Sequence, residues 1–341
     1  MIAPVSPAPF TSNRFMKRFG LSTPIALAPM ALASGGELAA ASAKAGALGL
    51  IGGGYGDLGW VEEQYGIAGQ ALSTEPEAAA RLGCGFITWK MEEDRAALDF
   101  VLERDGAPAA IMLSFGDPGT IAREVVRRGL PLIYQIQTMA QLAPAVDAGA
   151  SVIVAQGAEA GGHGMNAVDG RSTFTFVPEI ADWLAANAPH VDLLAAGGIA
   201  DGRGLAAAMT LGADGALIGS RLWATRESLA PEAAIDEAVQ ASGDDTARSA
   251  VFDILREKNW PAEYNFRSLR NAIHRQWEDR LEELRADPAA AITDYKAGVA
   301  AQDYNRAHVT VGEGVGLIGD APSAGEVIAQ ITAEAKRLLG S

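Results

Sequence analysis

The chain has 341 residues, of which 49% are hydrophobic and 20% are charged, a balance typical of a globular protein with a buried core. Its formal net charge of −15 disfavours nucleic acid and anionic membrane surfaces as partners, because phosphate binding requires clustered Lys and Arg. The single cysteine, Cys84, excludes an intramolecular disulfide and a cysteine-based metal site. Without a long apolar run or a signal-peptide pattern, we expect a soluble, cytoplasmic protein with no membrane partner.

Eight short apolar runs recur along the first two-thirds of the chain. Each is too short for a helix, and most do not alternate with polar residues, as expected for strands buried on both faces. The runs are Ile25–Ala28, Leu48–Ile51, Gly85–Trp89, Ala110–Leu113, Leu132–Ile136, Val152–Ala155, Leu193–Ala196 and Ala216–Ile218.

Alanine-rich amphipathic segments lie between these runs, and several are followed by a glycine that would end a helix. They include Glu37–Ala45, Asp94–Glu103, Ala122–Arg128, Met139–Ala148 and Gly204–Leu211. Eight strands that alternate with helices favour an α/β fold of the (β/α)8 TIM barrel type over residues 20–230. The count is weak evidence against an open, doubly wound sheet, which usually has five or six strands.

The pattern changes after about residue 230. Consecutive helices are expected there, and residues 231–310 are interpreted as a helical insertion or lid over the barrel. Residues 311–341 include an amphipathic segment that should pack back on the barrel. The expected helices are Ala233–Ala241, Val251–Lys258, Ser268–Arg285, Pro288–Ala301 and, in the last segment, Ser323–Leu339.

The loops after the last two strands are rich in glycine. Gly197 and Gly198 follow the seventh run, and Gly219 and Ser220 follow the eighth. This fold commonly holds a phosphate at that place, because glycine lets the backbone approach an anion and helix N-termini present unpaired N–H groups. Glycines that only form tight turns are the alternative interpretation.

The segment AQGAEAGGHG (155–164) follows the sixth run and ends near His163. Bare backbone of this kind suits a flat aromatic cofactor, and an imidazole can exchange protons at neutral pH. His163 is the only histidine expected at the barrel mouth, since His190, His274 and His308 fall in helices or connections. A histidine that only orders its loop is an equally good interpretation from sequence position.

Other chemistries have little support. No lysine ends the last four strands, which disfavours a Schiff base. Glu159 and His163 are too few ligands for a metal, so no metal site is expected. Ser114 and Ser220 have no histidine placed in sequence to form a triad, and no GxSxG surrounds them.

Three segments together resemble the nitronate monooxygenase family: PIALAPMA (24–31), AQGAEAGGHG (155–164) and LLAAGGIADGRGLAAAMTLGADGALIGSRLWATRES (193–228). The resemblance implies a TIM barrel with noncovalent FMN and His163 as the catalytic histidine. The implied cofactor-binding residues are Pro29, Met30, Ala31, Thr88 (with Trp89 as its rival), Gln135, Gln156, Gly161, Ala196, Gly197, Gly198, Gly219 and Ser220.

The resemblance also implies a reaction. A nitroalkane or its nitronate would be oxidised by dioxygen to a carbonyl compound and nitrite. His163 would remove the α-proton of a neutral nitroalkane, or, once protonated, hold the oxygens of a nitronate. Three alternatives stay open: an FMN-dependent NAD(P)H reductase of a quinone or enoyl thioester, a flavin-free barrel for a phosphorylated metabolite, and a barrel without catalysis. A homo-oligomer is compatible with the sequence.

Overall fold

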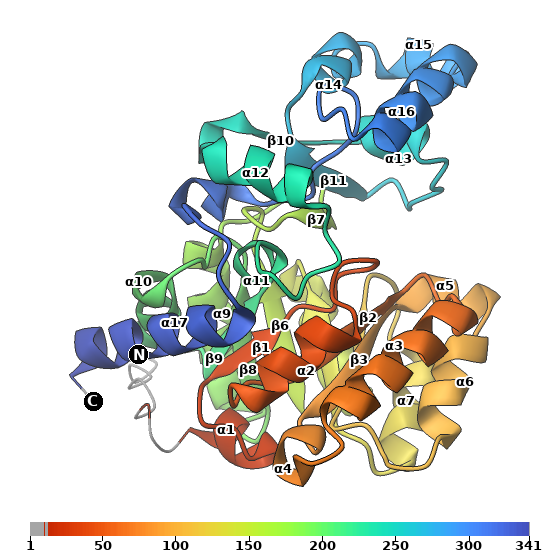
Figure 1. Ribbon diagram of the computed structural model, residues 1–341. Coiled ribbons are helices and arrows are strands. Elements are labelled where there is room, and N and C mark those ends of the chain that lie inside the picture. Colours follow the sequence, from red (N-terminus) through yellow and green to blue (C-terminus); the bar gives the residue numbers. More distant parts are fainter. Residues whose placement is uncertain (1–9, 11–12, 341) are drawn as a thin grey trace.

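The computed structural model describes residue 10 and residues 13–340. Its main body is a barrel of eight parallel strands, paired in the order β1-β9-β8-β6-β5-β4-β3-β2. A parallel bridge between Ala26 of β1 and Leu48, just before β2, closes the ring, and Leu27 N–H donates to the Leu48 carbonyl at 2.9 Å. The fold is therefore a TIM barrel, with its helices outside the strands (Figure 1).

All eight apolar runs overlap a barrel strand. The strands are β1 (Ile25–Leu27), β2 (Gly49–Gly54), β3 (Leu82–Ile87), β4 (Ile111–Ser114), β5 (Leu132–Ile136), β6 (Val152–Gln156), β8 (Asp192–Ala196) and β9 (Gly215–Ile218). The largest shift is in β3, which begins three residues before the expected run and ends at Ile87.

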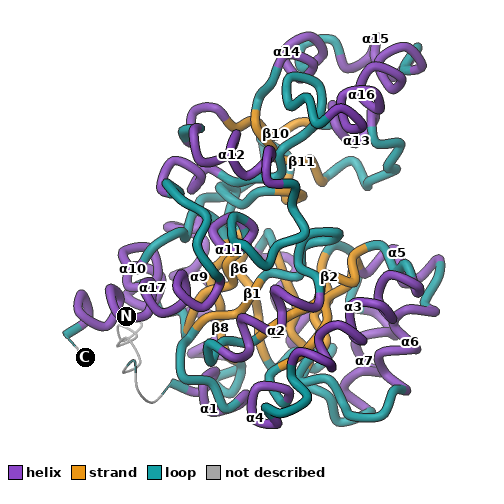
Figure 2. The backbone as a smooth tube through the Cα atoms, viewed as in Figure 1, coloured by secondary structure: helices purple, strands orange, loops and turns teal. Residues whose placement is uncertain are grey.

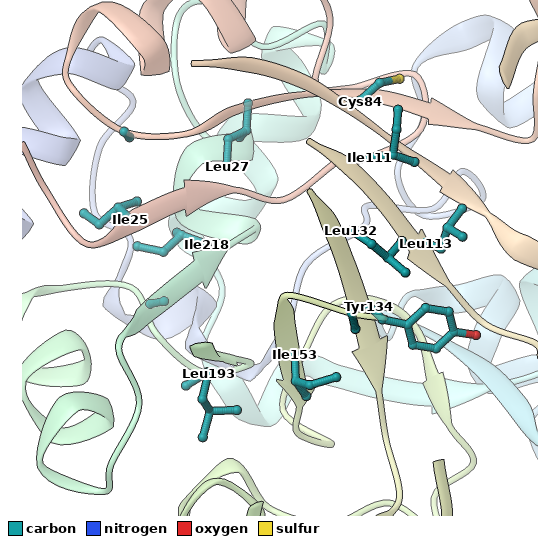
Figure 3. Close-up of a cluster of buried hydrophobic side chains, with 14 of the residues drawn as sticks. Ile25, Leu27, Cys84, Ile111, Leu113, Leu132, Tyr134, Ile153, Leu193 and Ile218 are labelled. Carbon is teal, nitrogen blue, oxygen red and sulfur yellow. The ribbon is translucent and has the colours of Figure 1, made fainter. Parts of the chain in front are cut away.

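The strands are apolar on both faces because the barrel has two hydrophobic cores. Inward side chains such as Leu50, Met112 and Val154 fill the interior, together with Phe15 and Phe19. Outward side chains form the layer beneath the helices, which Figure 3 shows for several neighbouring strands. Burial on both faces explains why the runs do not alternate with polar residues.

The helices around the barrel are α2 (Gly36–Lys44), α3 (Leu58–Ala71), α4 (Pro76–Ala79), α5 (Thr88–Glu93), α6 (Ala96–Glu103), α7 (Gly119–Arg127), α8 (Leu142–Asp147) after the short η1 (Met139–Gln141), α9 (Thr173–Asn187), α10 (Gly202–Thr210) and α11 (Ser220–Trp223). Helix α1 (Arg14–Phe19) supplies Phe15 and Phe19 to the interior core. Helix α17 (Ala324–Leu339) packs Val327 and Ile331 into the outer core with Leu205 and Met209 of α10. Among the described helices, none has the length and apolar character that crossing a membrane requires.

A second body, which we call the cap, consists of β7 (Gly162–Met165) and residues 232–317. It contains α12 (Glu232–Gln240), η2 (Gly243–Asp245), β10 (Thr246–Ser249), α13 (Val251–Leu255), β11 (Tyr264–Leu269), α14 (Ala272–Trp277), α15 (Leu281–Ala286), α16 (Ala289–Ala301) and η3 (Glu313–Leu317). Figure 2 shows it above one end of the barrel, with its own strands in orange.

The cap is not wholly helical, so the expectation of consecutive helices is wrong for β10 and β11. These strands form an antiparallel sheet in the order β10-β11-β7. The expected helix Ser268–Arg285 begins inside β11, whose buried residues Tyr264, Phe266 and Ser268 alternate with less buried ones. This period of two is the mark of a strand.

Candidate active site

A cavity of about 630 Å³ lies between the C-terminal ends of the barrel strands and the cap. Ser114 and Gln135 border it from the barrel, and Leu255, Trp260 and Tyr295 border it from the cap. Functional groups of TIM barrels gather at this end of the strands. The cavity is therefore the natural place for a cofactor and a substrate.

Most of the residues singled out from the sequence meet at this cavity. His163 lines it, as do Pro29, Met30, Ala31, Gln135, Gln156, Gly161, Ala196, Gly197, Gly198, Gly219 and Ser220. Thr88 does not, because β3 ends at Ile87 and Thr88 begins α5, where it is fully buried. Ile87 lines the cavity in its place, and the rival Trp89 does not.

The two glycine loops present unused backbone donors. Within the described residues, the N–H groups of Gly198 and Gly219 have no hydrogen-bond partner. Gly198 has φ of +74°, which side chains rarely adopt. The Ser220 hydroxyl accepts from Gly312 N–H at 2.9 Å, so its own hydrogen remains available. These donors fit a phosphate group.

Bare backbone also borders the region where a flat ring would lie. A Cβ added to Gly85 would come within 2.3 Å of Pro29 Cγ, so glycine there lets Pro29 sit across the barrel mouth. A Cβ on Gly161 would lie 2.6 Å from Gly312 N. Both contacts are with the protein itself, so these glycines bring Pro29 and Gly312 to the border of the cavity. Its volume of about 630 Å³ is in the range of cofactor sites, and its free N–H groups fit a phosphate.

His163 lies in β7 rather than in a loop, paired with Phe266 of β11. Its Nε2 is 2.7 Å from Asp253 Oδ1, and both side chains are buried. Gln156 Nε2 donates to the His163 carbonyl at 3.0 Å. Because the Asp253 carboxylate can only accept a hydrogen bond, the ring hydrogen lies on Nε2. Nδ1 is then left as a proton acceptor. Nδ1 makes no hydrogen bond to any residue the structure describes.

Aromatic rings enclose this imidazole. Trp260 stacks on it with ring centroids 3.4 Å apart and an angle of 11°. Phe266 and Phe115 follow at 4.9 and 6.4 Å. Tyr55 fixes Trp260, since its hydroxyl accepts from Trp260 Nε1 at 3.0 Å. The rings shield His163 from water.

This burial lowers the pKa of His163 to about 4, although the hydrogen bond to Asp253 acts in the opposite direction. His163 is therefore uncharged at neutral pH. A role as a protonated group that holds nitronate oxygens, which the sequence left open, is not expected there.

Two arginines of the cap hold the segment before His163 in place. Arg248 donates to the carbonyls of Ala160 and Gly162 at 2.6 and 3.1 Å. Arg267 donates to the Ala158 carbonyl at 3.2 Å. Burial lowers the pKa of Arg248 to about 9, so it still carries its charge at neutral pH. The cap thus positions the backbone that carries the imidazole.

Sequence reasoning missed several residues of this site. Asp253 lies 90 residues after His163, in a segment read only as a helix, and no local motif marks it. His308 also lines the cavity, contrary to the expectation that His163 alone would do so. Its Nδ1 is 2.7 Å from the Tyr295 hydroxyl, and burial lowers its pKa to about 3.

Backbone strain gathers at the same place. Four described residues other than glycine have positive φ, and Leu32, Phe115 and Gln302 among them line the cavity. Such conformations cost about 1–3 kcal/mol each and are concentrated at functional sites.

Within the described part of the chain, no group of three or more His, Cys, Asp or Glu side chains could hold a metal ion.

Comparison with known proteins agrees with this architecture. The model of the nitronate monooxygenase family matches residues 12–334. A nitronate monooxygenase, npaC, of Metarhizium robertsii is 31% identical over 92% of this chain and 91% of its own length. FabK from Thermotoga maritima has the same fold, with a TM-score of 0.80, 26% identity and coverage of 96% of this chain and 97% of its own.

The nitroalkane oxidase from Streptomyces ansochromogenes is similar in fold, with a TM-score of 0.73 and 22% identity, over 94% of this chain and 98% of its own. Since the family model spans nearly the whole chain, barrel and cap included, the match is not a likeness of one motif. The chain belongs to the nitronate monooxygenase family and is an enzyme of the monooxygenase type.

Proposed function

We propose that this protein binds FMN in the cavity and oxidises alkyl nitronates with dioxygen, releasing a carbonyl compound and nitrite. Family membership supports the nitronate as substrate. The observation that carries the proposal is the pair of His163 and Asp253, which presents an unprotonated imidazole nitrogen to a cavity that fits a phosphorylated planar ring.

The chain offers binding groups for both ends of FMN. Gly197, Gly198, Gly219 and Ser220 would bind the phosphate through N–H groups and the hydroxyl, with Ala196 beside them. The residues that would border the ring and its ribityl chain are Pro29, Met30, Ala31, Gln135, Gln156 and Gly161. When bound, FMN would supply the electron chemistry between the organic substrate and dioxygen.

His163 would act on protons. Its Nδ1 accepts the α-proton of a neutral nitroalkane, and the electron pair of the broken C–H bond stays on the nitronate. Asp253 stabilises the imidazolium formed in this step. Since burial holds the pKa of His163 near 4, the imidazole is a weak base. Preformed nitronates are therefore expected to react faster than neutral nitroalkanes.

The aromatic walls serve a second purpose. Trp260, Phe266 and Phe115 exclude water around the imidazole, which strengthens electrostatic interactions inside the site.

The test of the proposed function is nitrite release from a preformed nitronate by protein loaded with FMN. The proposal expects nitrite at a rate proportional to the FMN bound. Protein that binds FMN but releases no nitrite would overturn it.

A further inference from the structure

The cavity has a charge opposite to that of the whole chain. The formal net charge is −15, yet Arg256, Lys258 and Lys296 line the cavity against a single carboxylate, Glu159. That carboxylate is already engaged at the start of α9, where it accepts from Thr173 N–H at 3.0 Å and from the Thr173 hydroxyl at 2.8 Å. It forms no ion pair with any of these three cations.

The three cations differ in what they contact. Lys296 Nζ is 2.5 Å from the Glu257 carboxylate and is exposed. Lys258 Nζ is also exposed and lies 4.6 Å from the centre of the Tyr55 ring. Arg256 is half-buried, lies beside the Tyr55 hydroxyl, and forms no ion pair with any carboxylate the structure describes. Neither Lys258 nor Arg256 thus has a carboxylate partner among the described residues, and Arg256 is the less exposed of the two.

The guanidinium of Arg256 is placed in the wall of the cavity. It lies over the Phe266 ring, 4.7 Å from the ring centre, and one of its terminal nitrogens is buried without a partner. The buried nitrogen has no access to the cavity. Nε and the other terminal nitrogen keep accessible surface, so this edge of the guanidinium can meet an anion.

Arg256 and His163 share surroundings. Both contact Phe266, and the same short helix that supplies Asp253 to His163 ends at Arg256. The Arg256 charge also lowers the pKa of His163, after the larger effect of burial. A substrate bound against His163 would therefore lie in the field of this arginine.

We propose that Arg256 is the anion receptor of the site and binds the two oxygens of the nitronate group through its planar fork. A nitronate carries its negative charge on two oxygens in one plane, as a carboxylate does, and guanidinium pairs with such groups through two parallel hydrogen bonds. The uncharged imidazole of His163 supplies no such charge. This inference rests on the proposed function for the identity of the substrate.

Nitrate is a suitable probe, because it is planar, anionic and inert to oxidation. Its dissociation constant is measured by calorimetry at constant ionic strength on FMN-loaded protein, for the wild type, Arg256→Gln and Arg256→Lys. Lys296→Gln is the matched control, since it removes a cation of the same cavity that already has a partner. We expect Arg256→Gln to weaken nitrate binding between about tenfold and about 150-fold, the range of a charge-assisted hydrogen bond. Arg256→Lys should fall in between, and the control should stay within about twofold.

Two further readouts keep the test decisive. The dissociation constant of FMN and the thermal midpoint should be unchanged in the Arg256→Lys variant, which reports on folding. The KM for a nitronate should rise in Arg256→Gln, while the KM for the neutral nitroalkane should not. Unchanged nitrate binding in Arg256→Gln, or no nitrate binding by the wild type, overturns the inference. Nitrate binding through Arg256 without nitrite release from nitronates would instead overturn the proposed function alone.

Discussion

Replacing Asp253 with asparagine tests how His163 is activated. The amide can still accept from Nε2, so the geometry of the pair at 2.7 Å is retained while the negative charge is lost. A hydrogen bond to a charged group contributes about 1.5–3 kcal/mol. At about 1.4 kcal/mol for each factor of ten, Asp253→Asn should slow turnover of a neutral nitroalkane between about tenfold and about 150-fold.

A preformed nitronate needs no proton removal, so its turnover should fall by less than about threefold in the same variant. Because Asp253 raises the pKa of His163, its loss should also lower that pKa below about 4 and move the acid limb of the pH profile to lower pH. Steady-state nitrite release with both substrates measures these effects. Asp244→Asn, an exposed position of the cap, is the control. Equal losses with the two substrates would refute the positioning role.

The remaining predictions concern His163 and Gly219. His163→Asn should retain FMN, seen in the visible spectrum, and lose neutral nitroalkane turnover far more than nitronate turnover; parallel losses would remove its role as a base. Gly219→Asp should weaken FMN binding at least tenfold by repelling the phosphate. Gly219→Ala should bind FMN nearly as the wild type does, because its Cβ would meet nothing closer than 3.7 Å. Equal dissociation constants of the two variants in FMN titration would show that the phosphate binds elsewhere. The free energy of unfolding should fall as pH drops from about 6.5 to about 4, because only the unfolded chain then takes up protons on His163 and His308. The share of His163 should be about 2–3 kcal/mol. Urea unfolding at both pH values should show a smaller fall in His163→Asn, and an equal fall would argue against the low pKa.

The barrel could be predicted because its signals are local. Leu132–Ile136 coincides with β5, and a short run buried on both faces has few other structures open to it. The strand ends were less certain. β3 ends at Ile87, two residues before the expected end, so Thr88 lies at the start of α5 and not in the cavity wall.

The cap was harder to predict from the sequence, because its functional side chains are brought together only by tertiary contacts. The alternation in Tyr264–Leu269 was the available signal for β11, and the charged helices after it obscured that signal. No local sequence motif marks Asp253 or Arg256, because they come next to His163 and Phe266 only when α13 packs against β7 and β11. The resemblance to the family did not carry these two residues either, because they lie outside its motifs.

The most direct test of the account follows the visible spectrum of FMN-loaded protein without oxygen. Addition of an alkyl nitronate should bleach the oxidised flavin rapidly, and readmitted air should restore the spectrum with release of nitrite. NADH should have little effect on the same sample. Rapid bleaching by NADH together with indifference to the nitronate would contradict the account and assign the cavity to a reductase.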